Sequence, residues 1–252
     1  MKNLKLFALP GLFAFFSACS FSPKLASVER NFIELNDTLI SPDSTTIALI
    51  SPYKKRIDDE MYGILIHSEM AFVKGQPESL LGNLVADLIL KKANEYYQNK
   101  GEPIDFCLLN NGGLRSSLPE GEITRGKIFE LMPFENELVV LTLSGEKVKM
   151  LFNYIASAEG MPVSGIKMGI LKSKAVNILI NEIPFDENKT YKVVTSDYLA
   201  AGGDKMSFFN EPVRMENLNK KLRDAIIEYM KEENGKGNRL KSKLDQRIYH
   251  EQ

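Results

Sequence analysis

The sequence predicts one α/β domain with mixed sheets. Short apolar runs typical of strands alternate along the chain with longer stretches whose apolar residues recur at helical spacing. No internal repeat and no low-complexity tract interrupts this alternation. With 252 residues, 44% of them apolar, the chain is long enough for one large or two small globular domains.

The first 18 residues differ from the rest. Lys2 and Lys5 precede a run of 13 uncharged residues, which is too short to span a bilayer and suits a secretory signal. Small residues stand directly before Cys19, a pattern that resembles the lipobox of bacterial lipoproteins. We therefore expect a lipoprotein signal peptide at 1–18 and lipidation of Cys19. An ordinary signal peptide with an incidental cysteine is the alternative.

This segment predicts an exported protein that is lipid-anchored to a bacterial membrane, at the periplasmic or outer-membrane face. Residues 19–30 are expected to form a tether, and residues 31–252 the folded domain. Removal of two lysines with the signal would change the formal net charge from −1 to −3. The near balance of 32 basic and 33 acidic residues argues against a nucleic acid polymer as partner. After lipidation only Cys107 would be free, so no intrachain disulfide is expected.

The elements follow in order from periodicity and punctuation. Ser79 stands where it can cap a helix whose apolar residues recur three and four positions apart. Beyond the last helix a polar tail, from about residue 235, is expected to fray. The predicted strands cover 63–69, 104–109, 137–143, 176–180 and 191–196; the predicted helices cover 78–97, 144–160 and 215–233, with a helical turn over 126–132.

The chain lacks the residues of several catalytic sites. His67 and His250 are its only histidines, and no HExxH, CxxC, G-x-S-x-G or P-loop pattern occurs. A two-metal phosphoesterase or a zinc hydrolase needs several His, Asp and Asn ligands in clustered motifs. We therefore expect no metal site, no cofactor and no catalytic residue in this chain, and His67 to be an exposed or satisfied side chain near a strand end.

The stretch "NNGGLRSSLPEGEIT" follows the apolar strand at 104–109. Strand ends are common ligand sites in α/β folds. Asn110 together with Gly112 and Gly113 lets the backbone turn tightly and bring its N–H groups close to a ligand. Arg115 offers a planar fork of donors that suits phosphate or carboxylate. A plain turn with a solvated arginine is the alternative.

Two further stretches favour the ligand interpretation. "SDYLAAGGDKMSFF" again follows a strand and joins Gly203 to Asp204, whose carboxylate could accept hydrogen bonds from vicinal sugar hydroxyls. Tyr198 precedes that aspartate by six residues, and Phe134 lies after a proline in the polar loop of "ELMPFENELVV". Two loop aromatics could stack on the two faces of a flat heterocycle, at about 1–3 kcal/mol for a base on one ring.

Together these stretches resemble one known family. "NNGGLRSSLPEGEITRGKIFELMPFENELVVLTLSGEKV" is similar to the start of the C-terminal domain of the 5′-nucleotidase family, and "ESLLGNLVAD" and "YLAAGGD" fall in that domain's order and spacing. The resemblance extends over roughly residues 30 to 230. It implies a four-layer α/β/β/α fold that binds the nucleotide.

The resemblance also implies roles for individual residues. Asn110 and Arg115 would contact the substrate, Phe134 and Tyr198 would stack on the base, and Asp204 would bind the ribose hydroxyls. One position departs from the family pattern. Where family members carry a phosphate-binding arginine before E-x-x-L-G-N-L, this chain has Pro77, with Lys74 as the nearest basic residue.

The family's metallophosphoesterase domain has no counterpart in this sequence, and two functions follow from that. In the first, the chain is the nucleotide-binding half of a split 5′-nucleotidase, and a separately encoded metallophosphatase supplies the divalent metals. In the second, it is a non-catalytic surface lipoprotein that binds nucleotides or nucleosides.

Overall fold

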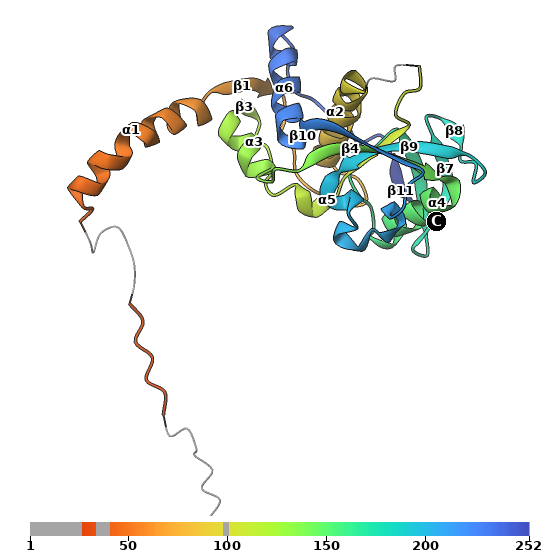
Figure 1. Cartoon of the computed structure of the whole chain (residues 1–252), viewed down its shortest axis with the longest axis horizontal. Coiled ribbons are helices and arrows are strands. Elements are labelled where there is room, and N and C mark those ends of the chain that lie inside the picture. The colour runs from red at the N-terminus through yellow and green to blue at the C-terminus, as the bar shows by residue number, and fades with distance from the viewer. Residues whose placement is uncertain (1–26, 34–40, 98–100, 252) are drawn as a thin grey trace, which may run out of the picture. The chain divides into compact units, whose positions relative to one another are not determined.

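The computed structural model describes residues 27–33, 41–97 and 101–251 (Figure 1). The predicted signal peptide and Cys19 lie outside these residues. The chain divides into two units, Met1–Leu49 and Ile50–Gln252. Within the described ranges, the second unit holds every strand and most of the helices. No helix in those ranges is both long and apolar enough to cross a membrane.

Helices and strands alternate along the described residues from Ser44 onward, as the sequence predicts. The helices are α1 (Ser44–Met61), α2 (Leu80–Tyr96), α3 (Arg125–Leu131), α4 (Gly145–Ser157), α5 (Asp197–Ala200) and α6 (Leu222–Gly235). The strands are β1 (Ile64–Ser68), β2 (Phe106–Leu108), β3 (Gly121–Thr124), β4 (Glu137–Ser144), β5 (Val163–Ser164), β6 (Ile166–Leu171), β7 (Lys174–Ile180), β8 (Ile183–Pro184), β9 (Thr190–Ser196), β10 (Arg214–Lys221) and β11 (Ile248–His250).

A five-stranded mixed sheet, in the order β10-β4-β9-β2-β5, lies at the centre of the fold. Strands β2 and β9 run parallel, and the other pairs are antiparallel. Strands β11, β6, β7 and β8 form a second mixed sheet, and β1 and β3 form a short antiparallel pair. The predicted α/β class with mixed sheets is confirmed.

Both faces of the inner strands β4, β9 and β2 are largely buried, and their side chains alternate between two cores. In β4, Leu138 and Val140 join the core that α2 and α6 cover. Val139 and Leu141 of the same strand join a second core with α4 and the second sheet. Helix α4 turns its remaining face to solvent. Helices and the second sheet thus enclose the central sheet, which holds the ends of its strands in fixed positions.

The expected helix caps form. Ser79 accepts a hydrogen bond from the Gly82 backbone N at 3.0 Å, so α2 begins where the sequence indicates. Gly160, at φ +108°, follows the end of α4, in agreement with the predicted glycine stop. Helix α1, to which the sequence analysis assigned no element, begins after Asp43, whose Oδ1 accepts from the Thr46 backbone N at 2.7 Å. No α1 residue is buried.

The predicted helix over 215–233 is wrong in its first third. Residues Arg214–Lys221 form β10, which pairs with β4 through Met215↔Leu141 and Glu216↔Val140, and the helix begins at Leu222. The segment is polar and helix-compatible by propensity. Pairing with the open edge of β4 overrides that preference, because strand propensity depends on the neighbouring strand.

The predicted frayed tail is also wrong. Leu240 and Ile248 are each only 2% exposed, and β11 pairs in parallel with β6. The Arg247 guanidinium binds the carboxylates of Asp87 and Asp245 at 2.6 and 2.8 Å. Two apolar side chains and one arginine thus fix a segment whose composition is mostly polar.

One buried charge joins α2 to α6. The Lys92 side chain is 1% exposed, and its Nζ lies 2.6–2.8 Å from carboxylates of Glu95, Glu228 and Glu232. Burial alone would lower the lysine pKa, but the three carboxylates raise it above its ordinary value. The same contact lowers the pKa of Glu228.

We expect Lys92→Met to lower the free energy of unfolding by about 1–3 kcal/mol at pH 7, because three carboxylates lose their shared cation. A carboxylate with a lowered folded-state pKa contributes stability above its unfolded pKa of about 4.3 and loses it in acid. The difference between wild type and variant should therefore shrink below about pH 4 in urea titrations. Lys91→Met, at a more exposed ion pair of 3.2 Å, is the matched control and should cost about 0–1 kcal/mol. A loss for Lys92→Met that does not change with pH would contradict this account.

Candidate functional site

The first site loop leaves the buried strand β2 at its carboxyl end. Asn110 has an extended backbone, and Asn111–Gly113 then form a single 3-10 turn. The Asn111 side-chain amide donates to the Gly160 carbonyl at 3.1 Å, and the Arg115 backbone N donates to the Leu131 carbonyl at 2.8 Å. These bonds hold the loop at both ends, so Asn110 and Arg115 project from a fixed backbone.

The two glycines of this loop differ in what surrounds them. A Cβ on Gly113 would lie 2.6 Å from the Asn110 Oδ1, well inside contact distance. A Cβ on Gly112 would meet the Asn110 Nδ2 at an ordinary 3.5 Å. Gly113 therefore provides the room that the Asn110 side chain occupies.

The second site loop follows β9. Ser196 caps the short helix α5 by accepting from the Leu199 backbone N at 3.3 Å. Tyr198 therefore lies in this helix and not in a loop as the sequence analysis expected, since four residues are too few to show a helical period. A Cβ on Gly203 would lie 2.6 Å from ring atoms of Tyr198. Gly203 thus lets the ring lie against the backbone of the turn.

Asp204 links the two loops. Its Oδ2 accepts from the Asn110 Nδ2 at 2.6 Å, and its Oδ1 accepts from the Tyr198 hydroxyl at 2.8 Å. Its backbone carbonyl accepts from the Tyr154 hydroxyl at 2.7 Å. At φ +53° it adopts the left-handed conformation, which a non-glycine residue keeps only where its surroundings hold it. The carboxylate is therefore held in place and still has lone pairs for a ligand.

The hydrogen bond to Asp204 raises the pKa of the Tyr198 hydroxyl. The phenol therefore keeps its proton, and its hydrogen bond to Asp204, to a higher pH than an ordinary tyrosine. The residue is 48% exposed. The tyrosine is thus fixed at its hydroxyl end while much of its ring surface remains accessible.

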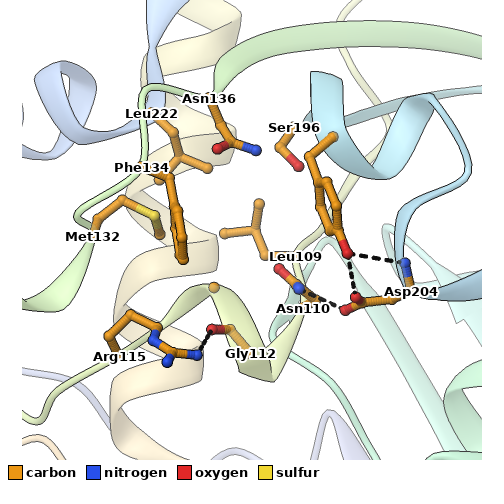
Figure 2. A pocket seen from close by; sticks show the side chains of 12 residues that line it. Leu109, Asn110, Gly112, Arg115, Met132, Phe134, Asn136, Ser196, Asp204 and Leu222 are labelled. Atoms are coloured by element: carbon orange, nitrogen blue, oxygen red, sulfur yellow. Dashed lines mark hydrogen bonds between the residues drawn. The ribbon is translucent and has the colours of Figure 1, made fainter.

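Phe134 lies in the connection between α3 and β4, as the sequence analysis expected, and the residue is 42% exposed. A phenylalanine with this much accessible surface can stack on a flat ligand. Figure 2 shows Phe134 on one side of a cavity and Asp204 on the other, with Asn136 and Ser196 at one end between them.

The cavity has a volume of about 390 Å³, within the range of small-ligand sites. Seven of the eight substrate-binding residues predicted from the sequence line it, and Gly203 acts from behind Tyr198. The sequence analysis missed five lining residues. Met132, Asn136 and Ser196 stood inside the stretches already singled out, whereas Leu109 and Leu222 gave no local signal. The lining consists of Leu109, Asn110, Gly112, Gly113, Arg115, Met132, Phe134, Asn136, Ser196, Tyr198, Asp204 and Leu222.

The cavity lining has two charged side chains, Arg115 and Asp204, and the arginine is the less constrained of the two. Arg115 is exposed, donates from Nη1 to the Gly112 carbonyl at 3.3 Å, and makes no ion pair with any described residue. Lys74 donates to the Leu114 carbonyl at 3.0 Å and is not among the lining residues. The cavity therefore combines apolar walls, one held carboxylate and one guanidinium with free donors.

The described residues contain no group of three or more His, Cys, Asp and Glu side chains that could hold a metal ion. His67 lies in β1 and His250 in β11, with Nε2 atoms 3.8 and 3.7 Å from Glu122 and Glu159. Each histidine therefore faces a single carboxylate on the surface. These residues do not fit a two-metal centre.

Comparison with known proteins decides the family. A family model described as the C-terminal domain of 5′-nucleotidase matches residues 65–211, more than half of the chain. The chain belongs to the 5′-nucleotidase family. It is also 30% identical over 187 residues to the trifunctional nucleotide phosphoesterase YfkN of Bacillus subtilis, an alignment that covers 68% of this chain and 12% of that protein.

Two other members of the family are similar over most of this chain. The 5′-nucleotidase of Vibrio vulnificus is 26% identical, over 70% of this chain and 32% of its own. The structure of a 5′-nucleotidase precursor from Thermus thermophilus superposes with a TM-score of 0.69 at 26% identity, covering 81% of this chain and 42% of that one. The chain thus spans less than half the length of these 5′-nucleotidase relatives and corresponds to their C-terminal part.

We expect Gly113→Ala to displace the Asn110 side chain and break its hydrogen bond to Asp204, because the new Cβ would lie 2.6 Å from Oδ1. The side-chain amide signals of Asn110 in an NMR spectrum should shift and exchange faster with water. Gly112→Ala, with its nearest contact at 3.5 Å, is the matched substitution and should move these signals much less. Equal shifts in the two variants would show that the loop tolerates no side chain at either position.

Proposed function

We propose that this chain is the nucleotide-binding half of a split 5′-nucleotidase. It would position a nucleoside 5′-phosphate for hydrolysis by a separately encoded metallophosphatase, in nucleotide catabolism or scavenging. The observation that carries the proposal is the cavity itself. It brings Phe134, Tyr198, Asp204 and Arg115 together from three separate parts of the chain.

The cavity offers a nucleoside complementary surfaces. Phe134 and Tyr198 present partly exposed rings. A flat base between them would gain about 1–3 kcal/mol from each ring. Asp204, already held by Asn110, has acceptor capacity for vicinal ribose hydroxyls. Asn136 adds an amide with both donors and an acceptor at the cavity wall.

The phosphate would bind Arg115. Its guanidinium is exposed and makes no ion pair with the described residues, so its donors remain available to an anion. Because the cavity lining has one arginine and one aspartate, the two ends of a nucleotide would be oriented in a defined sense.

The bond-breaking step would belong to the partner. Divalent metals in a phosphatase polarise the phosphate and activate water, and the residues described here do not fit such a centre. This chain would contribute proximity and orientation.

Binding and turnover together test this function. We expect Phe134→Ala to weaken adenosine and 5′-AMP alike by about 1–3 kcal/mol in calorimetric titrations. Arg115→Ala should weaken 5′-AMP by about 1.5–3 kcal/mol and leave adenosine nearly unchanged, because the guanidinium would contact the phosphate and not the nucleoside. We expect no 5′-AMP hydrolysis by the purified chain with Mn²⁺, Mg²⁺ or Zn²⁺, and turnover once a metallophosphatase encoded beside it is added.

The alternatives give different results in the same assays. Nucleotide binding without any stimulation of the phosphatase would favour the second function, a non-catalytic surface lipoprotein that binds nucleotides or nucleosides. Metal-dependent hydrolysis by the chain alone would contradict the split enzyme. If Arg115→Ala weakens the binding of 5′-AMP and adenosine equally, Arg115 has a structural role and does not bind the phosphate.

We further propose that Cys19 carries the lipid that anchors the chain to a bacterial membrane, because a basic start, an apolar run and small residues precede it in that order. Cells fed a clickable palmitate analogue should label the wild-type protein and leave Cys19→Ser unlabelled. If the variant is still labelled, Cys19 is not the lipidated residue.

A further inference from the structure

The aromatic ring at Phe134 stands on a connection without regular structure. Helix α3 ends at Leu131 and β4 begins at Glu137, so residues 132–136 have no ladder of backbone hydrogen bonds. A ring that stacks on a ligand needs a fixed backbone beneath it, since a mobile loop loses entropy each time the ligand binds.

The first turn of α6 supplies that fixation. The Leu222 backbone N donates to the Asn136 carbonyl at 2.9 Å. The Arg223 Nη1 donates to the carbonyls of Met132 and Phe134 at 3.4 and 3.3 Å. The Arg223 Nη2 forms a short ion pair with Glu135. One guanidinium thus reaches three of the five residues in the connection.

Arg223 is itself firmly held. It is 5% exposed, and its guanidinium lies over the ring of Phe129 in α3, 4.1 Å from the ring centre. Its partner Glu135 also binds Lys221, and hydrogen bonds from Lys221 and Arg223 lower the pKa of that carboxyl to about 2. Glu135 is therefore ionised at any physiological pH, so its ion pair with Arg223 is not lost by protonation.

Packing alone does not explain an arginine at this position. Its Nε is buried and has no hydrogen-bond partner among the described residues, which costs free energy. A methionine would fill the space of the aliphatic stem without that buried donor. Both terminal nitrogens of Arg223 bind the connection that carries Phe134: Nη1 donates to the Phe134 carbonyl and Nη2 pairs with Glu135.

We propose that Arg223 is a positioning residue that fixes Phe134 for stacking on the base and thereby sets the affinity of the site for nucleosides. Arg223 does not line the cavity and acts only through the backbone of residues 132–135. This inference rests on the proposed function, because it requires that Phe134 contacts the ligand.

A double-mutant cycle on the full chain tests it, with adenosine as the probe. We expect Arg223→Met to weaken adenosine binding about tenfold when Phe134 is present. In the Phe134→Ala background the same substitution should change the dissociation constant less than twofold, because the ring that Arg223 positions is gone. Thermal melts should show that each variant is folded at the temperature of the titration.

Lys221→Met is the matched control. It removes a cation from the same carboxylate but no bond to a backbone carbonyl, so adenosine affinity should change less than twofold. If Arg223→Met does not fold, Arg223→Lys keeps the buried charge without the fork and should still weaken adenosine. If neither variant folds, Arg223 is a structural residue and the proposal is wrong.

The remaining outcomes separate this inference from the function on which it rests. An equal loss in both Phe134 backgrounds, or no loss in either, overturns the positioning role. Wild-type protein that binds neither adenosine nor 5′-AMP overturns the proposed function itself. If Phe134→Ala binds adenosine with wild-type affinity, the ring does not contact the ligand, and the inference is wrong.

Discussion

Strands β2 and β9 run parallel at the middle of the five-stranded sheet, and their pairing brings the two halves of the cavity together. Phe106 pairs with Val193 and Cys107 with Val194, so both strands end at the same edge of the sheet. Loops that leave this edge are the usual ligand-binding segments of α/β folds. The hydrogen bond from Asn110 to Asp204, between residues 94 positions apart, depends on that register. A shift of one residue would point each side chain to the opposite face.

Burial on both faces makes this register the only favourable one. Strand β2 is apolar at all three positions, and each of its residues is buried. The central sheet carries one core against α2 and α6 and another against α4 and the second sheet. The site can therefore use polar, partly exposed and even strained residues, such as Asp204 in its left-handed conformation, without endangering the fold. The stability comes from the layers, and the chemistry is confined to the edge.

The sequence predicted the fold class and most of the site because both leave local signals. Glycine pairs after apolar runs marked the loops, and Phe134 lay in a polar context that a core residue would not have. The errors share a cause, which is that long-range pairing overrides local composition. Strand β10 is polar and was predicted as helix, and the tail was predicted to fray although Ile248 and Arg247 fasten it to distant elements. Leu222 illustrates the limit for the site: it lines the cavity only because α6 begins beside β4, which no local pattern indicates.

The form of the cavity also bears on how the chain would serve hydrolysis under the proposed function, since the described residues contain no cluster of metal ligands. The side chains of Asn110, Tyr198 and Asp204 bind one another, so little of the site has to be ordered when a ligand enters. Apolar side chains line its depth, whereas the one guanidinium of the lining is exposed. A nucleotide that places its base against the two rings would therefore hold its phosphate at the solvent-facing end, beside Arg115. A second protein could reach a phosphate presented in this way without entering the base-binding part of the cavity. Under the proposed function, a binding domain and a metal-bearing domain on separate chains would need to meet only at the phosphate.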